Sequence, residues 1–155
     1  MSDQPEIRRG TAADLPAVAA LLANAGLPTA DLGTAGLQSW LVEAGGALVG
    51  VIALERFGSE ALLRSLAVAP AYRKLGVGRR LVARLEEDAR ADGVRQLVLL
   101  TETAETFFRT LGYRVTDRGS VGEASRQSAE FRSLCPVSAI CMSKRLAGAR
   151  PRAPA

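Results

Sequence analysis

The residues of this chain with the clearest chemical potential form a short basic stretch with two glycines, Arg-Lys-Leu-Gly-Val-Gly-Arg at positions 73–79. An apolar run before it ends at Val68, and apolar residues at helical spacing follow it, so the stretch is predicted to join a strand to a helix. The first amides of a helix lack internal partners and carry the positive end of the helix dipole, and glycine lets the backbone approach an anion closely. The stretch therefore suits a phosphate group, or a pyrophosphate, because basic side chains surround it: Arg73, Lys74, Arg79 and Arg80.

The spacing of the two glycines, Gly76 and Gly78, excludes two common phosphate-binding motifs. A Walker loop needs four residues between its glycines followed by Gly-Lys-Ser/Thr, which is absent here. A dinucleotide-binding turn needs a third glycine at the position where Leu81 stands. What remains is Arg-x-x-Gly-x-Gly after a strand that ends in Val-Ala-Pro. The alternative is a tight turn between a strand and a helix, with arginines that are only solvated.

The absence of histidine restricts the catalytic chemistry. It excludes a Ser-His-Asp triad, a Cys-His dyad and most zinc sites, and Cys135 and Cys141 have no further partners for a metal, so we expect no metal site. A general base must be a carboxylate, a water chain or a perturbed Lys, Tyr or Cys. Glu55, at the end of an apolar strand, is the first candidate and Glu102 the second. The alternative for Glu55 is an ordinary strand-end carboxylate near Arg56.

Length and composition predict one domain, residues 1–146, followed by a disordered Pro/Ala tail, residues 147–155. The net charge of +4 resides in the last twelve residues, which hold four basic residues and no acid, so it is poor evidence for nucleic-acid binding. No apolar run approaches the roughly 20 residues that a membrane helix needs, and the N-terminus does not resemble a signal peptide. We expect a cytoplasmic protein that binds neither nucleic acid nor membranes.

Hydrophobic periodicity and turn residues predict alternating strands and helices over most of the chain. Thr11 and Asp14 have the spacing of a helix cap. Strands are expected at residues 6–9, 39–43, 47–55, 62–68, 96–101, 113–116 and 137–144. Helices are expected from Thr11 to about Gly26 and at residues 77–91 and 104–111, and a helix or helical turn is expected at residues 122–134. Residues 31–37 are predicted to form either a further helical turn or a mobile loop.

These motifs together resemble the GCN5-related N-acetyltransferase (GNAT) family, from Ile7 to about Leu146. The resemblance rests on Arg-x-x-Gly-x-Gly, on the Leu-Ala-Val at residues 66–68, and on Ala-x-x-Phe-Phe-x-x-Leu-Gly-Tyr at residues 104–113. It implies an α/β fold (an α+β mixed sheet) in which a mostly antiparallel sheet of about seven strands is splayed between strands 4 and 5. Helices would cover both faces of this sheet.

The resemblance also implies that acetyl-CoA is the cosubstrate. The pantetheine amides would pair with the backbone of the splayed strand, and the amides of the basic turn would hold the pyrophosphate. The implied contacts are Leu66, Ala67, Val68, Arg73, Lys74, Leu75, Gly76, Val77, Gly78 and Arg79, with Thr101, Phe107 and Phe108 further along the chain. The family often has Asn where Thr101 stands and a proton-donating tyrosine where Phe108 stands. Phe108 has no proton to give, but a thiolate of pKa about 8.5 leaves without much help.

Two residues of the splayed strand, Arg64 and Ser65, are expected near the substrate. An arginine in an apolar strand is unusual unless it points at solvent or at an anion, so either an acceptor with an oxyanion or a surface ion pair explains Arg64. In this family, the segment that corresponds to residues 31–37 covers the acceptor, so it is interpreted as a lid. Tyr113 is interpreted as packing, with a catalytic role as the alternative.

Cys135 and Cys141 are six positions apart and are not expected to form a disulfide in a cytoplasmic protein. Either they are two buried apolar thiols or they contact a soft element. The second option arises because segments 62–68, 99–105 and 130–142 resemble the GNAT subgroup associated with bacterial arsenic-resistance operons. That subgroup implies an amino-acid-like arsenical as acceptor.

The sequence thus predicts an acetyl-CoA-dependent N-acetyltransferase that acts on the primary amine of a small molecule. Transfer is expected to be direct, in a ternary complex, because no histidine-activated nucleophile exists for a covalent intermediate. A homodimer is a further expectation. Two alternatives stay open: acetylation of a peptide N-terminus or lysine, and a non-catalytic acyl-CoA sensor.

Overall fold

The computed structural model describes residues 5–27, 29, 32, 37–128, 131 and 138–146. The chain divides into two compact units. The first unit comprises residues 1–55 and 64–85, and the second comprises residues 56–63 and 86–155. The earlier division into residues 1–146 and a tail stays a prediction, because the tail lies outside the described residues.

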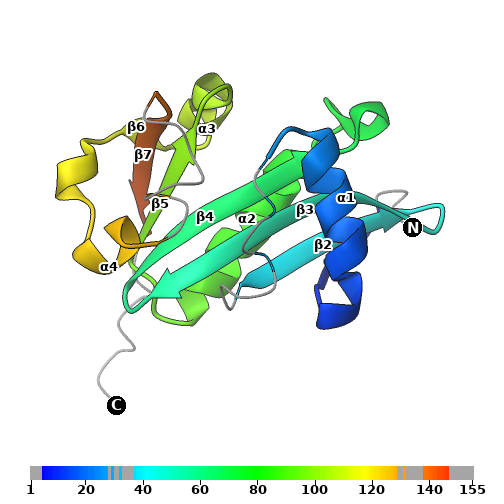
Figure 1. Cartoon of the computed structure of the whole chain (residues 1–155), viewed down its shortest axis with the longest axis horizontal. Helices are drawn as coiled ribbons and strands as arrows, with labels where there is room; N and C mark the ends of the chain where they lie inside the picture. The colour runs from blue at the N-terminus through cyan, green and yellow to red at the C-terminus, as the bar shows by residue number, and fades with distance from the viewer. Residues whose placement is uncertain are drawn as a thin grey trace, which may run out of the picture. The chain divides into compact units, whose positions relative to one another are not determined.

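Seven strands form one mixed sheet (Figure 1) in the order β1-β2-β3-β4-β5-β7-β6. Pairing is parallel between β4 and β5, and antiparallel in the pairs β1–β2, β2–β3, β5–β7 and β6–β7. The strands are β1 (Ile7–Arg9), β2 (Gln38–Ala44), β3 (Ala47–Phe57), β4 (Glu60–Val68), β5 (Gln96–Thr101), β6 (Arg114–Val115) and β7 (Ile140–Arg145). The mixed sheet with one parallel pair confirms the predicted fold class.

The helices include four α-helices and three single turns of 3-10 helix among the described residues. They are η1 (Ala12–Asp14), α1 (Leu15–Asn24), η2 (Pro70–Tyr72), α2 (Val77–Ala91), α3 (Glu105–Thr110), η3 (Arg118–Ser120) and α4 (Glu123–Arg126). In the part of the chain that the structure describes, none of these helices has the length and apolar character needed to cross a membrane.

The two parallel strands stay paired over only part of their length. The ladder runs from Glu60–Gln96 to Leu62–Val98 and then ends, although β4 continues to Val68 and β5 to Thr101. The paired residues of this ladder all belong to the second unit. Beyond Leu62, the ladder includes no backbone pairing of β4 with β5.

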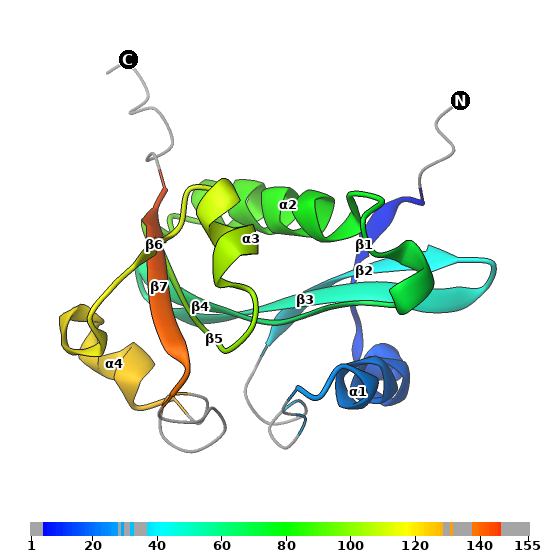
Figure 2. The same cartoon turned by 90° about the horizontal axis from the view of Figure 1, so that it is seen from above.

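In the first unit, helices pack on opposite faces of β2 and β3 (Figure 2). One face carries α1, whose apolar stripe packs in a cluster made up of Val18, Leu22, Leu41, Val51 and Ala67. The other face carries the beginning of α2, which buries Val77 and Leu81. Burial of these stripes follows from the helical spacing of their apolar residues.

The predicted helix cap is confirmed, because the Thr11 amide donates to Asp14 at 2.8 Å.

In the second unit, two polar clusters fix the elements around β5 and β7. Glu86 of α2 accepts hydrogen bonds from the Tyr113 hydroxyl at 2.7 Å and from Lys144 at 3.0 Å. Tyr113 is only 3% exposed, and burial together with the Glu86 charge raises its pKa, so its interpretation as packing is supported. Separately, Glu60 accepts from the Gly122 amide and the Ser125 hydroxyl.

Several predicted boundaries are wrong. Of the helix or helical turn expected at residues 122–134, the described part contains the short helix α4, which ends at Arg126; Glu60 holds Ser125, and a tight turn follows from Ser125 to Ser128. The last strand begins at Ile140, where Arg118 takes the preceding carbonyl of Ala139. The third strand extends beyond Glu55 to Phe57, so Glu55 is not a strand end. Parts of the predicted helix and lid, and Cys135, lie outside the described residues.

Candidate active site

The basic glycine stretch forms a turn that exposes backbone amides, and we name residues 73–79 the anion turn. Lys74 and Gly76 both take positive φ values, 65° and 84°, and Gly76 is the residue whose carbonyl receives the first helical bond, from the Arg80 amide at 3.0 Å. Among the described residues, no hydrogen-bond partner exists for the amides of residues 74 to 79. Open space surrounds the position of a Cβ on Gly76. Such a run of free amides is a concave anion site.

The basic side chains of this region divide into two groups. Arg73 donates from Nε to the Val68 carbonyl at 3.0 Å, and Arg80 donates to the Pro5 carbonyl at 2.7 Å. These two arginines brace the turn against neighbouring backbone. Lys74 and Arg79 are exposed beside the free amides, so they remain available to an anionic ligand. The sequence predicted that Arg80 adds charge around the ligand; it donates to Pro5 in this structure, and a contact with the ligand stays a prediction.

Gly50 of β3 allows the anion turn to sit close to the sheet. A Cβ at this position would lie 3.0 Å from Val77 Cγ1 and 3.2 Å from Leu81 Cδ1, the residues that begin α2. Real Cβ atoms seldom come this close, so a larger residue would push the start of α2 outward. Sequence reasoning missed Gly50, although a glycine inside an apolar strand is a signal for close backbone approach.

Strand β4 carries a local irregularity at Ser65. Its φ of 60° is positive, which is uncommon for a residue with a side chain and marks a local kink in the strand. The following residues, Leu66, Ala67 and Val68, are the ones predicted to pair with pantetheine. The Ala69 amide donates to the Val49 carbonyl at 2.8 Å, which fixes the end of β4 on β3. No sequence signal indicated the kink.

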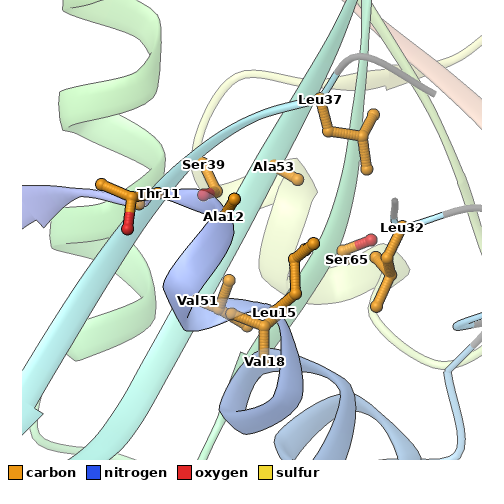
Figure 3. Close-up of a pocket in the computed structure, with 11 residues that line it drawn as sticks. Thr11, Ala12, Leu15, Val18, Leu32, Leu37, Ser39, Val51, Ala53 and Ser65 are labelled. Carbon is orange, nitrogen blue, oxygen red and sulfur yellow. The ribbon is translucent and has the colours of Figure 1, made fainter. Parts of the chain in front are cut away.

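A pocket of about 230 Å³ lies in the first unit, next to Ser65 (Figure 3). It is lined by η1 and α1 on one side and by β2, β3 and β4 on the other. Its lining residues are Gly10, Thr11, Ala12, Leu15, Val18, Leu32, Leu37, Ser39, Val51, Ala53 and Ser65. Leu32 and Leu37 belong to the segment that was predicted to be a lid. Their side chains reach the pocket, while the other residues from 33 to 36 lie outside the described part.

The predicted base and the predicted substrate residues form one connected group. Arg64 Nη1 lies 3.5 Å from Glu55 Oε1, and Arg64 Nε donates to Ser65 Oγ at 3.3 Å. The Arg64 side chain is 0% exposed and that of Glu55 is 14% exposed. The surface ion pair considered for Arg64 is therefore wrong: the arginine is paired with an anion inside the first unit. Arg56 lies elsewhere, because it donates to the Gly58 and Asp92 carbonyls.

The remaining predicted residues lie in the second unit. Thr101 accepts from the Ala104 amide at 3.0 Å and so holds the turn before α3. Phe108 is 4% exposed and packs edge-to-face with Phe107 and Tyr113, at centroid distances of 5.1 and 5.3 Å. These contacts explain Thr101 and Phe108 as structural residues. A role for either of them toward the cosubstrate stays a prediction.

Cys141 is buried, and burial raises the pKa of its thiol to about 11. It packs with Val98 and Val121 of the second unit. The expectation of a buried apolar thiol is confirmed for this residue. A thiol that is protonated at neutral pH is a poor ligand for a soft element.

The fold agrees with comparisons to known proteins. The model of the acetyltransferase (GNAT) domain matches residues 35–115, which include β4, the anion turn and α2. The chain therefore belongs to the GNAT acetyltransferase family. No curated protein matches this sequence closely enough to be counted as a relative.

Solved structures share the fold. N-acetylglutamate synthase from Neisseria gonorrhoeae, complexed with coenzyme A and N-acetyl-glutamate, has a TM-score of 0.78 and 22% identity over 95% of this chain. This chain covers only 36% of that one. A Mycobacterium tuberculosis protein in complex with CoA and a second ligand has a TM-score of 0.77 and 25% identity, over 92% of this chain and 100% of that one. The ribosomal-protein-S18-alanine N-acetyltransferase from Escherichia coli has a TM-score of 0.71 and 19% identity, over 96% and 97%.

Proposed function

We propose that this protein transfers the acetyl group of acetyl-CoA to the primary amine of a small molecule. The observation that carries the proposal is the anion turn, which offers the unpartnered amides of residues 74 to 79 and lies within the range that the family model matches. Pyrophosphate suits these amides because they supply several donors and the positive end of α2. Lys74 and Arg79 would add charge at the rim of the turn.

The proposed reaction is a direct transfer within a ternary complex. The amine nitrogen attacks the thioester carbonyl carbon, the new C–N bond forms, and the C–S bond breaks with its electron pair leaving on sulfur. One proton leaves the amine and one reaches the sulfur, so the products are the N-acetylated amine and CoA. Backbone amides near Leu66–Val68, beyond the kink at Ser65, would polarise the carbonyl. Their position past the end of the β4–β5 ladder supports this role.

Glu55 is proposed to accept the amine proton. Its carboxylate forms an ion pair with Arg64. Arg64 Nε in turn donates to the hydroxyl of Ser65, which lines the pocket. Glu55 itself does not line the pocket, so it would take the proton through an intervening water. Arg64 and Ser65 would then fix the position of the Glu55 carboxylate relative to the pocket wall. Arg64 would position this carboxylate without contacting the substrate.

The experiment that tests the proposal follows release of free CoA thiol with purified protein, acetyl-CoA and a panel of primary amines. Turnover that saturates in both substrates, with an N-acetyl product identified by mass spectrometry, is the expected result. Binding of CoA, measured by calorimetry, without acetylation of any small amine would contradict it.

Three other functions are separated by the same assay. An amino-acid-like arsenical as acceptor rests on the resemblance to the arsenic-resistance subgroup alone. Peptide acetylation is favoured if only peptides with a free N-terminus or lysine turn over, an activity related to the one named for the Escherichia coli structure. A non-catalytic acyl-CoA sensor would bind the coenzyme and acetylate neither amines nor peptides. Cytoplasmic location and a homodimer also remain proposals.

A further inference from the structure

We propose that the pocket beside Ser65 selects an acceptor with a small, apolar and uncharged body, and that it disfavours acceptors that carry a carboxylate next to the amine. The inference rests on the proposed function, because it assumes that this pocket receives the amine. It deepens that function by naming the class of substrate.

The lining of the pocket is apolar apart from three hydroxyl groups. Seven aliphatic or alanine side chains line it among the described residues: Ala12, Leu15, Val18, Leu32, Leu37, Val51 and Ala53. The polar side chains among the described lining residues are those of Thr11, Ser39 and Ser65, and none of these is ionised. Figure 3 shows the labelled side chains from both walls around this space. An aliphatic body of an acceptor would gain free energy by leaving water here.

Among the described residues that line this pocket, none offers a cationic side chain to a carboxylate. Arg64 is the arginine nearest in sequence to the lining, and its guanidinium already pairs with Glu55 and bonds to Ser65 Oγ. The sequence of residues 28–36, Pro-Thr-Ala-Asp-Leu-Gly-Thr-Ala-Gly, contains no lysine or arginine. Burial of a carboxylate without a cation is costly.

The three hydroxyls suit neutral polar groups. Arg64 Nε donates to Ser65 Oγ, so the Ser65 hydroxyl proton is free to point to an acceptor atom of a ligand. Thr11 Oγ1 donates to Asp14 at 3.2 Å, so its oxygen can receive a hydrogen bond from an amine or amide. Hydroxyls therefore orient a neutral acceptor without requiring a charge.

Isoamylamine and leucine are the probes of this inference, because isoamylamine is leucine without its carboxylate. The amine of isoamylamine is the more basic of the two, so a preference for it cannot come from a larger fraction of free amine. We expect kcat/KM for isoamylamine to exceed that for leucine by about tenfold or more. Glutamate and an arsenical amino acid are expected to rank with or below leucine.

Two neighbouring variants locate the preference in the pocket. Ala12 and Ala13 lie side by side in η1 and are both exposed, but only Ala12 lines the pocket. Ala12→Leu is expected to lower kcat/KM for isoamylamine about tenfold, with KM for acetyl-CoA unchanged. Ala13→Leu, the matched control, is expected to leave both constants at the wild-type value. Thermal melting checks that both variants fold.

Each outcome decides between the claims. A higher kcat/KM for leucine or glutamate than for isoamylamine overturns the inference and leaves the acetyltransferase function intact. Equal effects of Ala12→Leu and Ala13→Leu overturn the assignment of this pocket to the acceptor. Absence of turnover with every amine, while CoA still binds, overturns the proposed function, and with it the inference.

Discussion

The anion turn and the acceptor pocket lie in the same unit but are built in different ways. The turn offers main-chain amides, and its fit to a ligand depends on Gly76, on the positive φ of Lys74 and on the start of α2. The pocket is defined by side chains from five elements, and its polar character depends on how Arg64 pairs with Glu55. A site made of backbone amides can bind the same ligand with many different side chains around it. In a pocket made of side chains, a single substitution can change which ligand binds.

The largest effect is expected on the side-chain region. Glu55→Gln removes the proposed proton acceptor while keeping its shape, so kcat is expected to fall about 100-fold with acetyl-CoA affinity retained. Steady-state kinetics and calorimetric titration with CoA measure the two quantities. Glu43→Gln is the control, because Glu43 is an exposed carboxylate that pairs with Arg8. An unchanged kcat in Glu55→Gln would remove Glu55 from catalysis.

The next effect concerns the backbone region. Gly76→Val places a branched side chain at φ 84° beside the free amides, which costs about 1–2 kcal/mol in strain, so acetyl-CoA affinity is expected to fall about tenfold or more. The control is Gly45→Val, since Gly45 also has positive φ, 61°, and open space but lies in the β2–β3 turn. Calorimetry should show weakened binding only for Gly76→Val. Equal loss in both variants would mean that the strain acts on folding and not on the site.

A smaller effect is expected at the packing contact beneath the anion turn. Gly50→Ala adds a Cβ 3.0 Å from Val77 Cγ1, so the start of α2 must shift by a few tenths of an ångström. Acetyl-CoA affinity is expected to fall about fivefold, within the cost range of an overpacked core, and kcat at saturation to stay unchanged. Val77→Ala in the same chain removes the clashing methyl and should restore affinity. Lack of rescue would mean that Gly50 does not position the turn.

The sequence predicted the backbone region better than the side-chain region, for a physical reason. Glycine spacing, the apolar run of β4 and the amphipathic pattern of α2 are local, and local patterns record backbone conformation directly. The pairing of Arg64 with Glu55 joins different strands, and the contact of Gly50 with Val77 joins a strand to a helix. Such contacts depend on register and packing, which no single stretch of sequence encodes.

The same distinction explains the wrong boundaries. The sequence predicts either a helix or a helical turn at residues 122–134, and the short α4, Glu123–Arg126, forms where Glu60, more than sixty positions earlier, binds Gly122 and Ser125. The kink at Ser65 is also not a local preference, because serine seldom takes positive φ. In both places, a tertiary contact or backbone strain outweighs the local conformational propensity of the residues.

The smallest effect is expected outside both regions, at Cys141. The folded pKa of about 11 lies above the ordinary value of 9.0, so the stability contributed by the protonated thiol is complete below about pH 9 and is lost as pH rises through about 11. Urea unfolding of the wild type and of Cys141→Ala across this range should converge at high pH. Native protein at pH 8 should label slowly at Cys141 with iodoacetamide, as peptide mass spectrometry would show. Fast labelling would mean an accessible thiolate.

The central claim is that bare main chain in the anion turn holds the diphosphate of coenzyme A. Amide chemical shifts in 15N-labelled protein, recorded during titration with CoA and separately with pantetheine, test it most directly. The account predicts that the amides of residues 74 to 79 show the largest shifts with CoA and almost none with pantetheine. CoA binding that leaves these amides unmoved, or equal shifts with pantetheine, would contradict it.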